Sequence, residues 1–346
     1  YESQYDDMSD QSIVITIIDN IDTSTIISDD LGYYQINTQD IWGLESESNI
    51  IGTTNIINGI MYIVGESYNS VGNLTACYWV DGSRVELPGG DWATCEELHA
   101  RLLNNAIDIS TDDLLPIQQS AKKHKVTVVC GINERDNNNS KSTLYNSLIT
   151  IDEHGDIVNH HRKLMPTNPE RMVWGMGDGH GLTVVDTPIG RVGSLICWEN
   201  FMPLARFALY SQGVEIYIAP TYDSGNDWVG TMQHIAREGR CWVLSAGVAL
   251  QRSDFPKDLA NLLELYPVDE DWINPGDSVV IAPGGVIVAG PMSKEKGYLL
   301  ADIDFKKAVN AKRTLDVAGH YSRPDIFTLT LNKSRKPLTN IINEED

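Results

Sequence analysis

The chain has 346 residues, 42% of them hydrophobic, and a formal net charge of −22. This length has room for one large or two modest domains, each with its own core. The acidic balance argues against nucleic acid or an anionic membrane as a partner, because both require a basic face on the protein. The sequence contains no apolar run long enough to cross a bilayer. We therefore expect neither a nucleic-acid-binding nor a membrane protein.

Cysteine usage bears on the compartment and on metal binding. The five cysteines form no Cys-x-x-Cys pair, and an odd number in a chain of this length is a poor disulfide framework. A reducing, cytoplasmic compartment fits best, although the start at Tyr1 rather than Met leaves a removed leader and secretion open. The eight histidines show no zinc-type spacing. The sequence therefore predicts no metal site.

Residues 1–97 differ in composition from the rest of the chain. No Lys or Arg occurs before Arg84, whereas 13 acidic residues do. Short β-type runs here are broken by Asn-Gly and Asp-Gly dipeptides, which favour tight turns. We expect an acidic, β-rich segment at residues 1–97 and a separate domain at residues 98–346. A weak internal echo resembles propeller-like repeats, and a carbohydrate- or partner-binding β module at residues 20–97 is one hypothesis.

From about residue 104 onward, strand and helix patterns alternate, which indicates an α/β layered domain. One helix is expected at residues 110–123, beginning at Ser110. Another is expected at residues 203–212, with Asn200 as its cap and Gly213 as its left-handed stop. Strands are expected at residues 126–131, 147–151, 157–161, 183–186, 191–196 and 215–219, the middle four forming two hairpins.

Cys197 falls between the expected strand at residues 191–196 and the turn into the following helix. Such a turn lifts a side chain clear of the sheet end, and amides at a helix start favour a thiolate over a thiol. A cysteine considered alone is more often an inert core residue. The surroundings of Cys197 favour a nucleophile, whereas Cys130 and Cys241 are expected to be buried packing residues.

Several motifs occur in order around this cysteine. Residues 193–203 read GSLICWENFMP, and residues 160–167 read HHRKLMPT. They resemble the nucleophile and lysine segments of nitrilases, which belong to the carbon-nitrogen hydrolase superfamily. The resemblance covers about residues 104–332, and several motifs in order are far more specific than one short pattern. Further matching segments lie at residues 131–136, 170–175, 219–221, 234–241, 274–278 and 319–325.

The resemblance implies an α/β fold of the carbon-nitrogen hydrolase type, a four-layer αββα sandwich with a Glu-Lys-Cys site. Cys197 corresponds to the nucleophile, and Lys163 to the catalytic lysine that stabilises charge developing on nitrogen. Glu170 matches the family's additional acidic residue, which would orient Lys163 or a water molecule. The backbone amide of Trp198 would complete an oxyanion-type site, and its indole would form a wall.

Two more carboxylates lie in matching segments. Glu134 is expected to take part in substrate binding with Trp198, and a purely structural role is equally open for Glu134 and for Glu199. The implied reaction is hydrolysis of a nitrile to a carboxylic acid and ammonia through a cysteine thioimidate and an acyl-enzyme. It requires neither a metal nor an organic cofactor.

The family's general base, a Glu at the end of an apolar amino-terminal strand, has no clear match. Glu66 ends an apolar run but lies rather far from Lys163, and Glu86 precedes a Pro-Gly turn but lacks the strand. We expect that residues 1–97 supply no normally placed glutamate and that the chain is a poor or inactive nitrilase. An amidase of the same superfamily and a catalytically silent, assembly-forming homologue are the alternatives.

The resemblance also implies the partners of the chain, which are a small-molecule nitrile and further copies of the chain itself. Nitrilases form dimers that extend into spirals or filaments, so we expect at least a dimer. The expected helix at residues 203–212 carries the apolar residues Leu204, Phe207, Ala208 and Leu209. It is a candidate pairing face, although core packing explains the same residues equally well.

Overall fold

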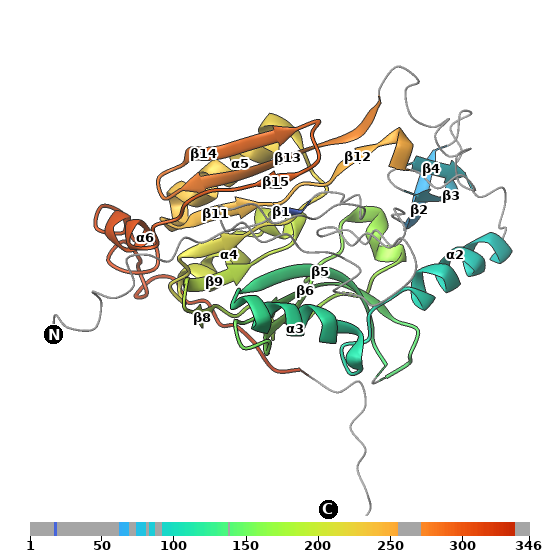
Figure 1. Cartoon of the computed structure of the whole chain (residues 1–346), viewed down its shortest axis with the longest axis horizontal. Helices are drawn as coiled ribbons and strands as arrows, with labels where there is room; N and C mark the ends of the chain where they lie inside the picture. Colours follow the sequence, from blue (N-terminus) through green and yellow to red (C-terminus); the bar gives the residue numbers. More distant parts are fainter. Residues whose placement is uncertain are drawn as a thin grey trace, which may run out of the picture.

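The computed structural model describes residues 17–18, 62–68, 74–80, 83–86, 92–137, 139–254 and 271–335. Two facing β-sheets with helices on their outer sides make up most of this part of the chain (Figure 1). Most of the acidic segment at residues 1–97 lies outside the described residues. Of its β-type run at residues 13–18, only residues 17–18 are described.

The smaller main sheet is a three-stranded antiparallel meander. Its strands are β5 (Val128–Arg135), β6 (Leu144–Ile151) and β7 (Ile157–Arg162). Helix α3 (Leu115–His124) runs along β5 and β6 in Figure 1. On that outer face, Ala121 of the helix packs in one cluster with Ile132 and Ile149 of the strands. Burial of these apolar side chains fixes α3 on the sheet.

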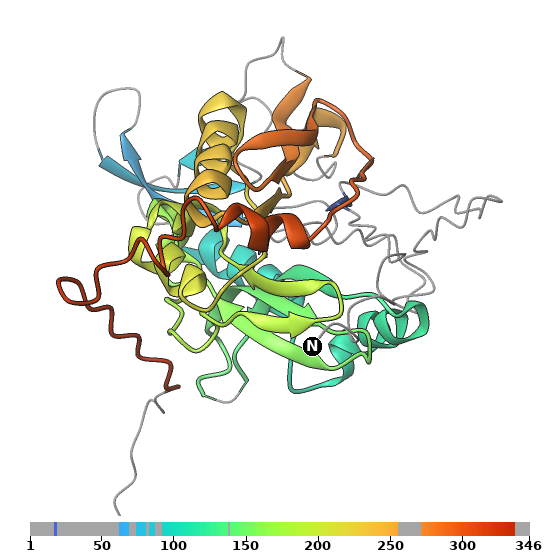
Figure 2. The ribbon, with the colours of Figure 1, turned by 90° about the vertical axis from the view of Figure 1, so that its left-hand side faces the viewer.

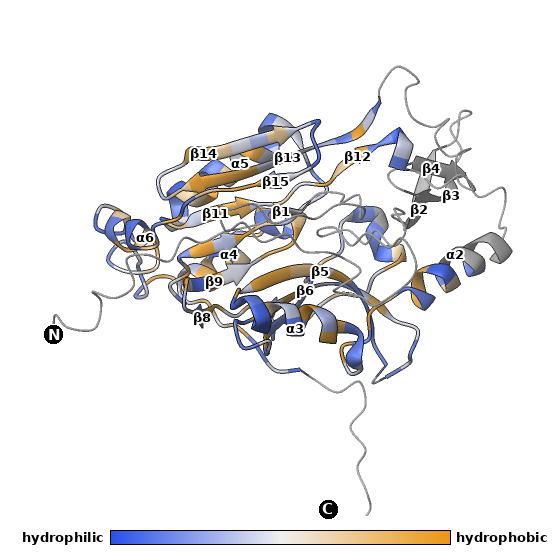
Figure 3. Ribbon diagram, in the orientation of Figure 1, coloured by the Kyte–Doolittle hydropathy of each residue, from blue (hydrophilic) through white to orange (hydrophobic). Residues whose placement is uncertain are grey.

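The larger sheet has the strand order β12-β13-β11-β10-β9-β8, with β14 paired to β13. β10 pairs in parallel with both β9 and β11, whereas β13 runs antiparallel to β11. Its strands are β8 (Val185–Thr187), β9 (Gly190–Ser194), β10 (Ile216–Ile218), β11 (Trp242–Ser245), β12 (Ala249–Gln251), β13 (Trp272–Ala282) and β14 (Val286–Ser293). In Figure 3, β11 and β13 are coloured mostly as hydrophobic, as expected for strands covered on both faces.

Two helices cover the outer face of this sheet. They are α4 (Pro203–Tyr210) and α5 (Gly225–Gly239), which connect the parallel strands β9, β10 and β11. In Figure 2 the yellow helix α5 lies beside the orange strands β13 and β14. Leu209 of α4 and Met232 of α5 share a fully buried cluster with Tyr217 of β10. The order of layers is therefore helix, sheet, sheet, helix, and the predicted αββα fold is confirmed.

The remaining elements lie around these layers. A separate three-stranded sheet has the order β2-β3-β4, and its strand β2 lies against the short helix η2. A two-residue strand β1 pairs with β15. The bounds are β1 (Ile17–Ile18), β2 (Tyr62–Tyr68), β3 (Leu74–Val80), β4 (Ser83–Glu86), α2 (Trp92–Asn104), η1 (Asp112–Leu114), η2 (Asn168–Met172), η3 (Cys197–Phe201), η4 (Arg252–Asp254), β15 (Tyr298–Leu299) and α6 (Lys306–Ala311).

Both predicted hairpins and both predicted helices are present, with shifted ends. The first helix begins at Leu115 rather than Ser110, because Thr111 caps the short helix η1 and a proline occupies the first turn of α3. The second begins at Pro203 as predicted but ends at Tyr210, two residues before the expected end, and Gly213, the expected left-handed stop, has a φ of +75° three residues beyond it. The prediction that Asn200 caps this helix is wrong, since the residue at the cap is Met202.

Candidate active site

Cys197 stands where the large sheet meets its outer helices. Strand β9 ends at Ser194, and the short 3-10 helix η3 begins at Cys197 itself. The backbone of Cys197 has a φ of +50°, a left-handed conformation that costs a residue with a Cβ roughly 1–2 kcal/mol. The Cys197 amide donates to Pro220 O at 2.8 Å. Strained backbone of this kind is concentrated at functional sites.

Asn200 holds the backbone of this turn through hydrogen bonds. Its amide group donates to the carbonyl oxygens of Leu195 and Cys197, at 3.2 and 2.7 Å, and its side-chain oxygen accepts from the hydroxyl of Tyr217 at 2.8 Å. Asn200 is fully buried. The side chain that the sequence predicted as a helix cap therefore holds the backbone of the cysteine turn, because a 3-10 turn replaces the first turn of the expected helix.

The thiol of Cys197 is buried, with 6% of the residue exposed. Burial raises the pKa of this thiol above its ordinary value, the positive charge of Lys163 lowers it, and the negative charge of Glu170 raises it. Hydrogen bonds from the Thr221 side chain and the Tyr222 backbone also favour the thiolate. The charges of Lys163 and Glu170 both act on the Cys197 thiol, so the structure brings these three predicted residues together.

Lys163 enters this site directly after β7. Its ammonium lies 2.6 Å from Glu170 Oε2 and 3.1 Å from the Thr167 hydroxyl, and its side chain has no exposed surface. The same Glu170 oxygen accepts the backbone N–H of Thr167 at 2.8 Å. Because the first turn of η2 fixes Glu170 in this way, Glu170 can hold the lysine in one position.

Trp198 follows the cysteine and lies at the surface. Half of the residue is exposed, and its indole N–H donates to Asp223 Oδ2 at 2.8 Å. The ring of Phe201 meets it edge to face, with 5.9 Å between centroids. The indole is therefore not a core side chain, and its place beside Cys197 suits a wall at the mouth of the site.

Glu134 is not brought to the thiol. Successive side chains of a strand point to opposite faces, and Ile132, two residues before Glu134, packs under α3 on the outer face of the sheet. There the Glu134 carboxylate accepts from the Ser147 hydroxyl at 2.6 Å and pairs with His160 at 2.7 Å and with Arg162. These contacts of Glu134 are all with side chains of its own sheet, and its expected role in substrate binding stays a prediction.

The two glutamates considered as general base lie in the small sheet β2-β3-β4. Glu66 is paired with Ala76, and Glu86 is paired with Cys77. Their side chains lie outside the described residues. Strand β2 contacts η2, the helix that carries Glu170. The expectation that residues 1–97 supply no catalytic glutamate stays a prediction.

Sequence reasoning did not identify Thr221 and Tyr222 as partners of the thiol. Residues 219–221 matched a family motif, but the hydrogen bonds arise only because β10 lies parallel to β9, so that the ends of both strands reach the same sheet edge. Cys241 is buried as expected, whereas Cys130 is only partly buried. Burial raises the pKa of both thiols to about 12, which disfavours the nucleophilic thiolate.

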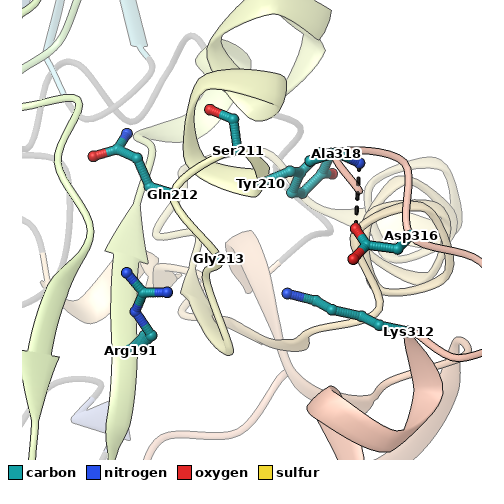
Figure 4. Close-up of a pocket in the computed structure, with 8 residues that line it drawn as sticks. All are labelled: Arg191, Tyr210, Ser211, Gln212, Gly213, Lys312, Asp316 and Ala318. Carbon is teal, nitrogen blue, oxygen red and sulfur yellow. Dashed lines mark hydrogen bonds between the residues drawn. The ribbon is translucent and has the colours of Figure 1, made fainter. Parts of the chain in front are cut away.

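A polar hollow of about 270 Å³ lies elsewhere, between the end of α4 and the segment after α6 (Figure 4). Arg191 and Lys312 face it from opposite sides, and the carboxylate of Asp316 accepts the backbone N–H of Ala318. None of the residues around Cys197 takes part. Its lining consists of Arg191, Tyr210, Ser211, Gln212, Gly213, Lys312, Asp316 and Ala318.

In the part of the chain that the structure describes, no three His, Cys, Asp or Glu side chains gather in the way that a metal ion would need. None of the helices there combines the length and the apolar character that a bilayer crossing demands.

Comparison with known proteins shows the family of this chain. The sequence model of the carbon-nitrogen hydrolase family matches residues 75–313. Nitrilase 3 of Arabidopsis thaliana is 42% identical over 243 residues, which cover 68% of each chain. The bifunctional nitrilase/nitrile hydratase NIT4 of Oryza sativa subsp. japonica is 44% identical over 230 residues, covering 66% of this chain and 62% of the relative. The crystal structure of the C. elegans NitFhit protein matches with a TM-score of 0.54 at 21% identity, over 70% of this chain and 57% of that one.

The αββα layers bring a cysteine, a lysine and a glutamate together, Cys197, Lys163 and Glu170. The chain belongs to the carbon-nitrogen hydrolase family, whose members act on carbon–nitrogen bonds other than peptide bonds. The family match begins at residue 75, upstream of the domain boundary expected near residue 97. The position of that boundary stays a prediction.

Proposed function

We propose that the protein hydrolyses a small nitrile to a carboxylic acid and ammonia, with Cys197 as the nucleophile. One observation carries the proposal. The buried Cys197 thiol and Lys163 share one site, in which Glu170 holds the Lys163 ammonium at 2.6 Å, and although burial raises the pKa of the thiol, the positive charge of Lys163 opposes that rise. A cation beside a thiol at a strained turn is the arrangement that nucleophilic catalysis by cysteine needs.

The chemistry proceeds in two halves. The Cys197 sulfur adds to the nitrile carbon as its proton is removed, and the nitrile nitrogen takes up a proton to give a thioimidate. A water molecule adds to the thioimidate carbon, ammonia leaves, and a thioester remains. A second water cleaves the carbon–sulfur bond, which releases the carboxylic acid and restores the thiol. Two water molecules are consumed for each nitrile.

The neighbouring residues divide the remaining tasks. The Lys163 ammonium stabilises the negative charge that develops on nitrogen when sulfur adds to carbon, and Glu170 orients it. The backbone amide of Trp198 is proposed to donate to the same developing charge. Because burial raises the pKa of the Cys197 thiol, a base has to accept its proton as the bond forms. Glu66 and Glu86 are the candidates that the sequence offers.

The tetrahedral intermediate can also collapse in a second way. If the thiol leaves instead of ammonia, the product is an amide, and the rice relative is named as both a nitrilase and a nitrile hydratase. Both outcomes begin from the same thioimidate at Cys197. We therefore propose that the acid is the main product and that an amide forms beside it.

The test measures ammonia and acid after incubation of the full chain with benzonitrile, with benzamide as a parallel substrate. The proposal expects ammonia from benzonitrile at a higher kcat/KM than from benzamide. Faster release from benzamide would identify an amidase of the same family. If neither substrate yields ammonia and no benzamide forms from benzonitrile, while the Cys197 thiol remains alkylatable, the chain is a silent homologue.

Self-association is a separate part of the proposal. In helix α4, Ala208 and Leu209 are buried in the core, but Leu204 is 67% exposed, and Phe201 just before the helix is also exposed. Met202 is exposed as well and Phe207 is partly exposed, so these four side chains are the apolar ones here that a second copy could contact. Light scattering at micromolar concentration should give at least a dimer mass, and a Leu204→Glu variant should lower it. A monomer mass for the unaltered chain would rule this out.

A further inference from the structure

The carboxylate of Glu199 connects the two segments that carry Lys163 and Cys197. Its Oε1 accepts the backbone N–H of Leu164, the residue after Lys163, at 2.6 Å. Its Oε2 accepts the backbone N–H of Ile196, the residue before Cys197, also at 2.6 Å. Glu199 is 1% exposed. One buried side chain therefore bonds to the neighbours of both residues.

His161 adds a third contact from the lysine side. Its Nε2 lies 3.0 and 3.1 Å from the two Glu199 oxygens, and neither side chain has any exposed surface. His161 stands two residues before Lys163, as Leu164 stands one after it. The backbone around Lys163 is thus held by the same carboxylate on both sides. Charge-assisted hydrogen bonds of this kind are stronger than neutral ones, and more so away from water.

These contacts exceed what a local helix cap would make. The bond to Ile196 spans three residues and closes the turn of η3, as a cap does. The bonds to Leu164 and His161, however, span 35 and 38 residues and reach the end of β7, which belongs to the other sheet. Glu199 therefore crosses from one sheet layer to the other at the point where the site is assembled.

We propose that Glu199 is a positioning residue, which sets the separation between the Lys163 ammonium and the Cys197 thiol without itself touching the substrate. This inference rests on the proposed function, in which that separation decides the rate. A misplacement of about 1 Å can cost on the order of 10²-fold in turnover. Because Lys163 lowers the pKa of the Cys197 thiol, a wider separation should also make the thiol harder to ionise.

The first variant is Glu199→Gln, which keeps the size of the side chain. An amide has one acceptor oxygen and an N–H₂ group, so one of the two backbone N–H groups then faces a donor. We expect kcat to fall on the order of 10²-fold with little change in KM, since the loss concerns the reacting geometry rather than binding. Glu199→Asp keeps the charge but is one methylene shorter, so it should fail to restore kcat.

The second readout needs no nitrile. Alkylation of Cys197 by iodoacetamide is followed against pH by mass spectrometry of the tryptic peptide 192–206. The midpoint for Glu199→Gln should rise by on the order of 1 pH unit, because a wider separation weakens the lowering effect of Lys163 on the pKa of the thiol. This profile decides the role of Glu199 even if the unaltered chain turns over no nitrile, so the two proposals fail separately.

Glu238→Gln serves as the matched control. Glu238 pairs with Arg206 at 2.9 Å and accepts from the Tyr210 hydroxyl at 3.0 Å, so its loss should lower the Tm. It should leave kcat and the alkylation midpoint unchanged. If Glu199→Gln behaves in the same way as this control, Glu199 only stabilises the fold and the proposal is overturned. Full activity in Glu199→Asp would overturn it as well, and that variant is measured in both assays if Glu199→Gln does not fold.

Discussion

The Lys163 ammonium lies 2.6 Å from the Glu170 carboxylate, and the lysine side chain has no contact with solvent. A buried ion pair contributes little net stability, because both charges lose their hydration. Removal of one partner destabilises the fold far more, because the other charge is then buried without a counter-charge. The pair is therefore better understood as a device that fixes the lysine at one point beside Cys197, and Glu170 adds its negative charge to the field at the thiol.

Replacement of Glu170 by Gln should lower kcat by roughly 10²-fold, because one oxygen of Glu170 accepts from both Lys163 and the Thr167 backbone. An amide oxygen can replace only part of this contact, so Lys163 moves. The measurement is kcat for benzonitrile, with Glu153→Gln as a control at an outer turn. Unchanged turnover in Glu170→Gln would show that Lys163 is held by other groups.

Replacement of Lys163 by Ala should lower kcat by about 10²–10³-fold or more, as removal of one oxyanion-type donor does. Lys163→Arg should be nearly as poor. The planar guanidinium needs more room than the compact ammonium, and the Lys163 side chain, whose ammonium contacts Glu170 and Thr167, has no exposed surface. Near-normal turnover of Lys163→Arg would show that the reaction needs only a positive charge at this position and not the compact lysine ammonium.

Replacement of Cys197 by Ala should abolish turnover and leave the fold intact. Alanine has the same Cβ as cysteine, so the cost of the φ of +50° is unchanged. Circular dichroism and Tm should be close to those of the unaltered chain, while benzonitrile yields no ammonia. Ammonia release by this variant at the original rate would place the nucleophile elsewhere.

Lys163 and Glu170 were predicted from motifs that resemble those of a family, and Cys197 from such a motif together with its place between an expected strand and a turn. The hairpin of β6 and β7 was equally local. The face on which Glu134 points was not predictable, because it depends on the register between β5 and β6, which pairs Glu134 with Tyr145. The same holds for Glu199, whose partners come from 35 and 38 residues away. Sequence spacing alone carries no information about such contacts.

Replacement of Gly177 by Ala should disturb the backbone around Lys163. A Cβ at this position would lie 2.1 Å from Arg162 O and 2.8 Å from Lys163 O, and backbone atoms cannot move away as a flexible side chain can. The Gly177 amide also donates to Lys163 O at 2.8 Å. We expect a loss of about 1–3 kcal/mol in the free energy of unfolding, measured by urea titration, together with a lower kcat. An unchanged free energy of unfolding in Gly177→Ala would contradict the close packing of Gly177 against the carbonyl oxygens of Arg162 and Lys163.

The last prediction concerns the dependence of stability on pH. Burial alone would raise the pKa of Glu134, but hydrogen bonds from His160 and Arg162, with their positive charges, lower it from 4.5 to about 2. A carboxyl whose pKa is lower in the folded state than in the unfolded state stabilises the fold above the unfolded value. That stability is lost as pH falls from about 4.5 towards 2, where the folded carboxyl also takes up a proton.

Glu134→Gln isolates this contribution, because Gln cannot titrate. Urea unfolding at a series of pH values from neutral to acid should show the unaltered chain more stable than the variant at neutral pH. The difference should shrink below pH 4.5, because Glu134 of the unfolded chain is then protonated, whereas the same carboxyl in the folded chain stays ionised until the pH approaches about 2. Part of the neutral-pH difference comes from Arg162, which the variant leaves buried beside an uncharged amide. The slope against pH is therefore the decisive quantity, and a difference that stays constant between neutral pH and pH 3 would contradict the lowered pKa of Glu134.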